Sequence, residues 1–264
     1  GALLNEEDLE LIDYVDLHQT LSSVPGVYVR EEDGFGLRPN IGIRGATPDR
    51  SQKITILEDG ILITPAPYSA PAAYYVPNIS RMENIEVLKG PSAISQGPHT
   101  VAGAINFVTK PLGETLNQID VSFGSDEYYK VQGLLSGAQD QTAWQLDLNS
   151  YGSGGFKELD SGGDTGFVRS EANLKIQHDF DLDREQRIVF KLGWADEDAD
   201  ETYLGLTDED FAIEPTRRYR ASQLANFDTD HLTMLLNHGI RFSDKLFVNT
   251  KVYWHEFNLS LIHI

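Results

Sequence analysis

The second half of the sequence alternates between apolar and polar side chains over long stretches, which limits the folds open to it. Because successive side chains of a β-strand point to opposite faces, a period of two predicts strands with one apolar and one polar face. Similar alternation near 119–124, 128–137, 144–149, 188–194, 232–242 and 246–254 predicts about seven antiparallel strands in all. In the clearest stretch, residues 168–180, one face collects Val168, Ala172, Leu174, Ile176 and Phe180, and the other collects Arg169, Glu171, Asn173, Lys175, Gln177 and Asp179.

The apolar faces of these expected strands carry no Lys, Arg, Asp or Glu. A charge that faces lipid at mid-depth costs about 2–4 kcal/mol, so this absence favours the strands of a membrane barrel. The strands also have roughly the 9–11 residues that a tilted transmembrane strand needs. A water-soluble sandwich shows the same alternation and remains the alternative at this point.

The expected connections alternate in length, as they do in bacterial outer-membrane barrels. Short turns are expected at 138–141, 181–186 and 243–245, and long loops at 152–166 and 196–227, while the short connection at 125–127 breaks the rule. About seven strands leave open edges and a face without a partner, so we expect this chain to be part of a longer one.

The first half predicts a small mixed α+β domain of about residues 1–113, followed by the strands of 114–264. Asn5 before three acidic residues predicts a helix start, and Pro25-Gly26 ends any helix. Asp59-Gly60 predicts a hairpin turn. Short strands are expected at 27–29, 41–44, 54–57, 61–63, 83–88 and 102–108, with a helical turn at 92–95.

Charge and composition exclude several functions. The chain has 264 residues and a formal net charge of -20, which argues against nucleic acid as a partner because phosphate binding needs a positive surface. It has no cysteine, so disulfides, thiol catalysis and Cys-based zinc sites are excluded. No apolar run is long enough for a transmembrane helix, and no signal peptide is visible.

No catalytic or metal-binding pattern emerges from the sequence. The seven His residues lack the HExxH spacing, and His231 and His238 are expected on opposite faces of a strand. The run Asp196, Asp198 and Asp200 begins like a calcium loop, but it lacks the glycine and the closing glutamate. We therefore expect neither catalysis, nor a bound metal, nor a cofactor.

Five short segments resemble, in the correct order, the plug domain of TonB-dependent outer-membrane receptors. They are LSSVPGV, IRG, ITILEDGI, IEVLKGP and GAINFVTKP. The resemblance implies a plug followed by the first strands of a transmembrane β-barrel in the bacterial outer membrane. Barrels that enclose a plug close with about 22 strands, so about seven strands would be only part of one. It also implies a non-enzymatic receptor that binds a scarce iron chelate outside the cell and imports it with energy supplied by TonB and its inner-membrane complex. Its further partners would be the chelate and outer-membrane lipid.

Within that family, the segments EEDGFGLRPNIGIRG and PAPYSAPAAYY most resemble receptors for ferric dicitrate. This narrower resemblance implies that plug residues form the floor of a ligand chamber. Plain packing between plug and barrel is the alternative for the tyrosines. The resemblance also implies that basic residues of the plug motifs pair with barrel glutamates. The floor residues are Arg38, Asn40, Tyr68, Tyr74 and Tyr75, and the pairing residues are Arg44 and Lys89.

Three arginines in the last long loop, Arg217, Arg218 and Arg220, are the other candidates for ligand binding. A guanidinium fork binds carboxylates with two parallel hydrogen bonds, and an anionic iron–citrate chelate needs such groups. The alternative is ordinary salt bridging within the loop. The acidic partners available there are Asp208, Glu209, Asp210 and Glu214.

Two other functions stay open. One is uptake of a different cargo by the same kind of receptor, such as a hydroxamate siderophore, haem or another metal chelate. The other is a secreted β-rich module that binds glycans, which predicts a water-soluble protein with its apolar faces buried.

Overall fold

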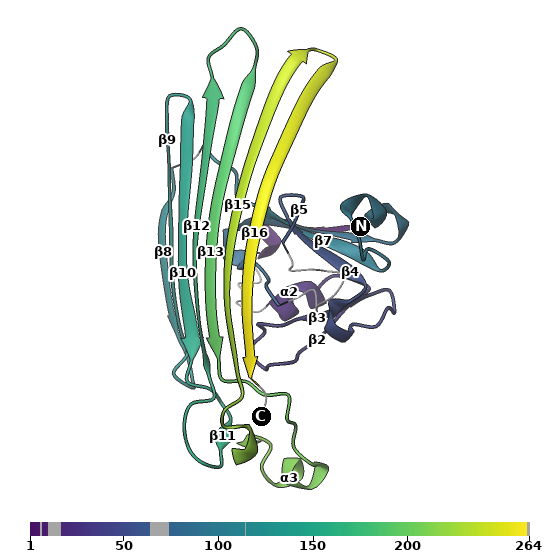
Figure 1. Ribbon diagram of the computed structural model, residues 1–264, viewed down its shortest axis with the longest axis vertical. Helices are drawn as coiled ribbons and strands as arrows, with labels where there is room; N and C mark the ends of the chain where they lie inside the picture. Colours follow the sequence, from purple (N-terminus) through teal and green to yellow (C-terminus); the bar gives the residue numbers. More distant parts are fainter. Residues whose placement is uncertain (6, 10–16, 64–73, 114, 263–264) are drawn as a thin grey trace. The chain divides into compact units, whose positions relative to one another are not determined.

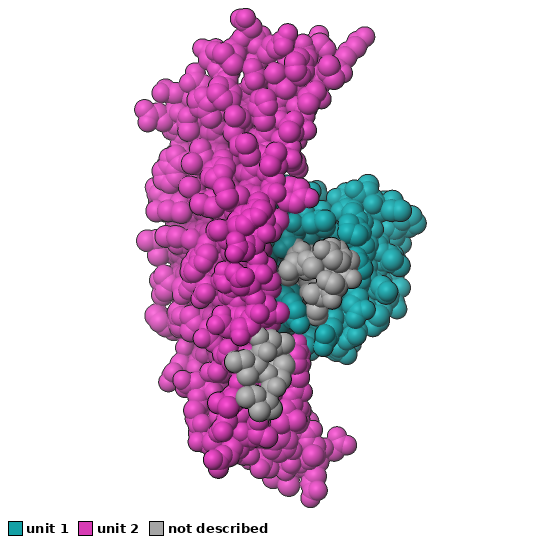
Figure 2. All heavy atoms as spheres, viewed as in Figure 1, with its two compact units in different colours: residues 1–111 teal, residues 112–264 magenta. Residues whose placement is uncertain are grey.

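A computed structural model describes residues 1–5, 7–9, 17–63, 74–113 and 115–262. The chain divides into two compact units, Gly1–Pro111 and Leu112–Ile264 (Figure 2). This division lies within two residues of the boundary expected after residue 113. Each unit has its own sheet and is described by itself.

The first unit is built on a five-stranded sheet in the order β1-β6-β7-β4-β5. β4 runs parallel to β7, whereas the other neighbours are antiparallel. A separate hairpin pairs β2 with β3. The strands of this unit are β1 (Ala2–Leu4), β2 (Val27–Arg30), β3 (Asn40–Ile43), β4 (Ile54–Glu58), β5 (Ile61–Leu62), β6 (Met82–Lys89) and β7 (Gly103–Thr109). Its helical segments are α2 (Leu17–Ser22), η1 (Asp49–Ser51), η2 (Ile79–Arg81) and η3 (Pro91–Gln96).

Local sequence explains most of these elements. Asp59 and Gly60 have φ of 48° and 75°, the left-handed pair that a two-residue hairpin turn between β4 and β5 requires. The β-branched residues of β4, β6 and β7 fill the core, where Ile56, Ile85 and Ile105 are fully buried. The expected strands and the helical turn at 92–95 are therefore confirmed.

Other features of the first unit were not expected. β1 pairs with β6. β4 and β7 are parallel neighbours, although 44 residues lie between the end of β4 and the start of β7.

The helix start expected at Asn5 has reciprocal capping hydrogen bonds. The amide of Asp8 donates to Asn5 Oδ1 (2.8 Å), and the amide of Asn5 donates to Asp8 Oδ2 (3.0 Å). The middle of the expected helix, residues 10–16, lies outside the described residues.

The second unit is a seven-stranded antiparallel sheet in which every strand pairs with its neighbour in sequence (Figure 1). The expected count and pairing are confirmed. Most strands are longer than the expected 9–11 residues, up to 18 in β15 and 17 in β16, whereas β8 has 7 and β9 has 11. They are β8 (Asn117–Phe123), β9 (Tyr129–Gln139), β10 (Thr142–Ser153), β12 (Phe167–Phe180), β13 (Gln186–Ala199), β15 (Asn226–Ser243) and β16 (Leu246–Ile262).

In this sheet the apolar face is exposed and the polar face is buried, the reverse of a water-soluble protein. Cross-strand register lines up Leu146, Leu174, Leu192, Met234 and Trp254 as one apolar row across five strands. On this face large apolar side chains are exposed, and on the opposite face polar side chains are buried. The exposed set includes Trp144, Leu148, Val168, Trp194, Leu236 and Val252; the buried set includes Gln145, Asp147, Asn149, Arg169, Glu171 and Glu197.

This burial pattern decides between the two expected architectures. A water-soluble sandwich buries its apolar face and exposes its polar one, which is the opposite arrangement. Lipid-facing strands of a membrane barrel expose an apolar band and turn polar residues inward. The sheet therefore has the side-chain pattern of barrel strands.

Acidic residues mark one limit of the apolar band. Asp196 and Asp230, which pair across β13 and β15, lie on the apolar face beyond Trp194. Glu256 shares this face in the row of Trp194, an exception to the expected absence of charge there. On β13 and β15 the strand continues past this limit with further acidic residues on the same face, Asp198 and Asp228.

A buried ion-pair cluster lies on the polar face. Arg169 Nη2 lies 2.6 Å from Glu171 Oε1, and Arg169 Nη1 lies 3.2 Å from Glu197 Oε2. All three side chains are at most 5% exposed. Alternation predicts that they share a face, but only the register of β12 and β13 brings Arg169 opposite Glu197.

The connections follow the expected pattern. Short turns join β9 to β10, β12 to β13 and β15 to β16, all at one end of the sheet (Figure 1). The first long loop (residues 154–166) and the second long loop (residues 200–225) lie at the other end, here called the long-loop end. In the described part of the chain, no helix is both long and apolar enough to cross a membrane.

Candidate ligand-binding site

The two long loops are joined to each other at the long-loop end. β11 (Glu158–Leu159) in the first loop pairs in parallel with β14 (Arg217–Arg218) in the second. The amide of Glu158 donates to Thr216 O (2.8 Å) and that of Asp160 to Arg218 O (2.9 Å). The second loop also contains α3 (Asp208–Ile213) and η4 (Arg220–Ser222).

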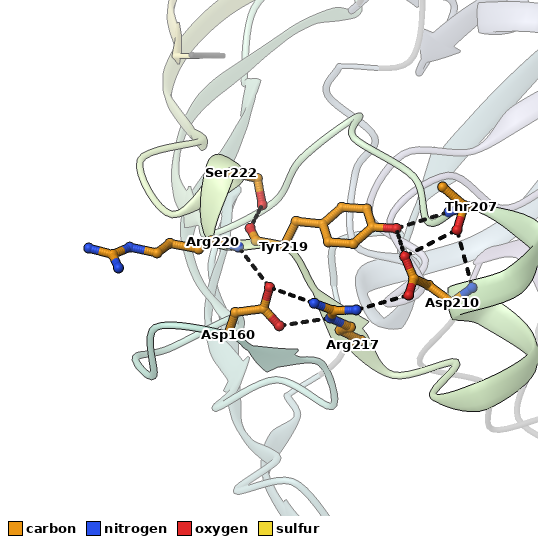
Figure 3. A network of polar contacts seen from close by, with 7 residues as sticks. All are labelled: Asp160, Thr207, Asp210, Arg217, Tyr219, Arg220 and Ser222. Atoms are coloured by element: carbon orange, nitrogen blue, oxygen red, sulfur yellow. Dashed lines mark hydrogen bonds and ion pairs between the residues drawn. The ribbon is translucent and has the colours of Figure 1, made fainter.

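Arg217 links three segments by ion pairs (Figure 3). Its Nε and Nη2 donate to the two oxygens of Asp160, at 2.8 and 3.2 Å, in the bidentate geometry that suits a guanidinium. Its Nη1 donates to Asp210 Oδ1 at 3.0 Å. These three side chains are about one-third exposed, so the network lies at the surface of the loops.

Tyr219 and Thr207 complete the network (Figure 3). The Tyr219 hydroxyl donates to Asp210 Oδ2 and accepts from the amide of Thr207 (3.1 Å). Thr207 is the N-cap of α3, and its Oγ1 accepts from the amide of Asp210 at 3.1 Å. Three acidic residues in the first turn of α3 suit the positive end of a helix.

Arg218 is 4% exposed, and its guanidinium donates hydrogen bonds to other residues of the second long loop. Its Nε donates to Ser222 Oγ (3.1 Å), its Nη2 to the carbonyls of Ser222 (2.8 Å) and Ala225 (3.1 Å), and its Nη1 to the carbonyl of Asp200. The guanidinium thus supplies donors to carbonyls at both ends of the second long loop.

Arg220 differs from its two neighbours. It is exposed, and its guanidinium points away from the network in Figure 3. Within the described chain its side chain takes part in no hydrogen bond or ion pair. Its backbone amide donates to Asp160 Oδ2 at 3.3 Å, and its carbonyl accepts from the amide of Gln223 at 3.0 Å. Of the three arginines, Arg220 alone has a guanidinium without a hydrogen-bond partner among the described residues.

The structure therefore does not assemble Arg217, Arg218 and Arg220 into one carboxylate fork. The alternative of salt bridging within the loop holds for Arg217 and Asp210. The second partner, Asp160, was not among the expected acids because it lies 57 residues earlier in the sequence. No local signal in the sequence links these two positions.

The junction of the loops is expected to be stable at neutral pH and to open in acid. Hydrogen bonding from Arg217 holds the pKa of Asp160 below its ordinary value, and hydrogen bonding from Tyr219 does the same for Asp210. A carboxyl with a lowered pKa contributes stability above its unfolded value, and this contribution is lost as the pH falls through the folded value. The junction should therefore weaken only below about pH 4.

Hydrogen exchange of the Glu158 and Asp160 amides, corrected for the intrinsic pH dependence, measures this opening. Protection should be constant between about pH 5 and 8. Amides in the middle of β10 serve as the control. Loss of protection near pH 6.5 would point to histidine and contradict the assignment, since neither long loop contains one.

The expected floor residues of the first unit are mostly engaged or buried. Asn40 is 1% exposed; its Nδ2 donates to Glu32 Oε2 (2.7 Å) and its Oδ1 accepts from the amide of Arg50 (2.7 Å). Arg38 is 3% exposed, and Tyr75 is 8% exposed. Tyr74 is half-buried, whereas Tyr68 lies outside the described residues. These contacts favour a packing role, and ligand binding by these residues stays a prediction.

Asp33, which the sequence did not single out, organises the segment before Asn40. Its carboxylate accepts from the backbone amides of Phe35, Leu37 and Arg38. An Asp followed by Gly and further turn residues is the signal for such an arrangement.

The two basic residues expected to pair with barrel glutamates lie close together. Lys89 Nζ donates to the carbonyl of Pro25, and the amide of Arg44 donates to the carbonyl of Gly26 at 2.9 Å. Arg44 is exposed, and its Nη1 lies 3.1 Å from where a Cβ on Gly90 would stand. Gly90, with φ of 85°, leaves room for the guanidinium. Pairing of Arg44 or Lys89 with barrel residues stays a prediction.

No group of three or more His, Asp or Glu side chains in the described ranges is arranged to hold a metal ion. The polar groups of the long-loop end are instead a carboxylate–guanidinium network and one projecting arginine. Such groups can bind and orient an anionic or polar ligand.

Comparison with protein families gives one match. The model described as "TonB-dependent Receptor Plug Domain" matches residues 2–104, which is nearly all of the first unit. Among curated proteins, the chain is 26% identical over 181 residues to the vitamin B12 transporter BtuB of Photobacterium profundum. That alignment covers 66% of this chain and 29% of the relative, so the chain spans less than a third of the relative's length.

Solved structures with the same fold cover both units. The ferric citrate transporter FecA in its unliganded form superposes with a TM-score of 0.81 and 21% identity, over 98% of this chain and 40% of that one. The ferric yersiniabactin uptake receptor FyuA from Yersinia pestis gives 0.80 and 19%, over 98% and 41%. At these identities the likeness concerns the fold.

Proposed function

Because this chain belongs to the TonB-dependent receptors, a family of transport proteins, we propose that it forms part of an outer-membrane receptor that imports a metal complex. The plug fold of residues 2–104, followed by a sheet with an exposed apolar face, is the observation that carries the proposal. Outer-membrane lipid would contact that face. TonB and its inner-membrane complex would supply the energy that rearranges the plug.

We propose an iron chelate of the citrate type as the cargo, with Arg220 as its contact at the long-loop end. An exposed guanidinium without an internal partner suits a carboxylate of the chelate. Arg217 and Arg218 then act within the protein, since their donors are taken by Asp160, Asp210 and backbone carbonyls. The fold likeness to FecA agrees with this choice without deciding it.

A corrinoid is the second candidate, and two observations favour it. Two curated relatives, from Photobacterium profundum and Vibrio vulnificus, are vitamin B12 transporters, at 26% and 24% identity. The two long loops also contain nine acidic and four basic residues, and a negative field repels an anionic chelate except near Arg220. A cargo with little net charge would not meet this repulsion.

Replacing Arg220 by Ala separates the two candidates. A hydrogen bond to a charged group contributes about 1.5–3 kcal/mol, so ferric dicitrate should bind the variant about 10- to 100-fold more weakly. Binding to the intact receptor in detergent is measured by calorimetry, with ferric dicitrate and cyanocobalamin as probes. Arg184→Ala, the same charge change at the short-turn end of the sheet, should leave both affinities unchanged.

Tight cyanocobalamin binding that Arg220→Ala leaves unaltered, together with no ferric dicitrate binding, would replace the first candidate by the second. Failure of both probes would reject both cargoes. Uptake of the bound probe by cells that lack TonB would contradict the proposed energy source.

A further inference from the structure

The short turn that carries Arg220 is held by side chains from outside it. η4 begins after Tyr219, whose side chain makes no capping hydrogen bond. The first amide of the turn, that of Arg220, instead donates to Asp160 Oδ2 of the first long loop. A carboxylate from a distant segment thus satisfies a donor that a helix end leaves without an internal acceptor.

The other end of the turn is held as well. Arg218 Nη2 donates to the carbonyl of Ser222, the last residue of η4, and to that of Ala225, three residues later. Asp160 cannot swing freely, because Arg217 binds both of its oxygens and is itself fixed by Asp210. The position of the Arg220 backbone is therefore set by a chain of contacts that runs from the first loop through Arg217.

We propose that Asp160 is a positioning residue for Arg220, acting on ligand affinity without touching the ligand. The inference rests on the proposed function of Arg220 as the contact for a carboxylate-bearing chelate. An arginine loses much conformational freedom when it binds a ligand, and this loss weakens binding. When the backbone is already fixed in the free protein, less freedom is lost on binding. Asp160 holds the backbone of Arg220 in place, although it lies 60 positions earlier in the sequence.

The sign of the effect distinguishes positioning from simple electrostatics. Asp160→Asn removes one negative charge near the proposed anion site, and charge alone then predicts tighter binding of ferric dicitrate. Loss of positioning predicts weaker binding. Asp164→Asn is the matched control: it makes the same charge change in the same exposed loop, away from the Arg217 network.

A double-mutant cycle on the intact receptor in detergent tests the proposal. We expect Asp160→Asn to weaken ferric dicitrate binding about 5- to 10-fold and to have no further effect in the Arg220→Ala background, as coupled residues do. Asp160→Glu should recover most of the affinity. An equal loss of affinity with and without Arg220→Ala would assign Asp160 a general structural role. Tighter binding by Asp160→Asn would mean that its charge alone affects the ligand. Either result overturns the proposal.

A spin label gives a readout that does not depend on the cargo. The chain has no cysteine, so Arg220→Cys provides a single attachment point here and keeps the backbone amide. Its mobility should rise when Asp160→Asn is added and stay unchanged with Asp164→Asn. If no form binds ferric dicitrate, the proposed cargo fails while this measurement still decides whether Asp160 fixes the turn. Unchanged mobility in Asp160→Asn would overturn the proposal.

Discussion

Replacing Arg81 by Met is expected to destabilise the first unit by about 3–5 kcal/mol, because it leaves a buried carboxylate without its main partner. Arg81 Nη1 and Nη2 donate to the two oxygens of Glu58 at 3.0 and 2.6 Å. The side chains are 5% and 11% exposed. This pair ties the end of η2 to the end of β4, next to the turn at Asp59-Gly60.

Hydrogen exchange of the β4 and β6 amides in the intact receptor measures the free energy of opening. Arg30→Met is the matched control in the same unit. Arg30 pairs with Asp49 at 3.5 Å, but both side chains are more than half exposed, so the loss should be about 0–1 kcal/mol. Equal effects of the two substitutions would mean that burial does not set the value of the Arg81–Glu58 pair.

Replacing Leu174 by Arg is expected to cost about 2–4 kcal/mol for folding into a bilayer, because it places a charge in the middle of the apolar face. Leu174 lies in the centre of β12, between Leu146 and Leu192 on the neighbouring strands. Urea titration of the intact receptor in lipid vesicles measures the change in the free energy of unfolding.

The depth of the substitution provides the control. Val168 lies on the same strand and face as Leu174, six residues nearer the long-loop end, and its cross-strand partner is Asp198. Val168→Arg should cost only about 0–1 kcal/mol, as charges near the membrane interface do. A larger loss for Val168→Arg than for Leu174→Arg would contradict the assignment of the apolar face to lipid.

The seven strands of the large sheet and most strands of the first unit followed from local patterns in the sequence. The period of two in residues 168–180 assigns Leu174 and Glu171 to opposite faces, whatever lies around them. Asp59-Gly60 specifies a turn because few other residue pairs accept positive φ. Such signals act over a few residues, so the order of elements and the plug motifs needed no knowledge of contacts between distant segments.

The candidate site depended on contacts that sequence order does not encode. Three arginines within four residues suggested a common fork, yet each has a different role. Arg217 pairs with Asp160 and Asp210, Arg218 is buried among backbone carbonyls, and Arg220 projects outward. A long arginine side chain can bind any acceptor within its reach. The spacing of the arginines in the sequence does not determine which acceptors folding places near them.

The sequence by itself determined which side chains share a face, where the chain turns and where the plug motifs lie, because these properties depend on neighbours within a few positions. Tertiary structure alone decided the parallel pairing of β4 with β7, the burial of Arg169 with Glu197, and the choice of Asp160 as partner of Arg217. Arg169 and Glu197 are 28 positions apart, Asp160 and Arg217 are 57 positions apart, and β4 and β7 are not consecutive strands. The energy of each contact therefore depends on which distant segments folding brings together.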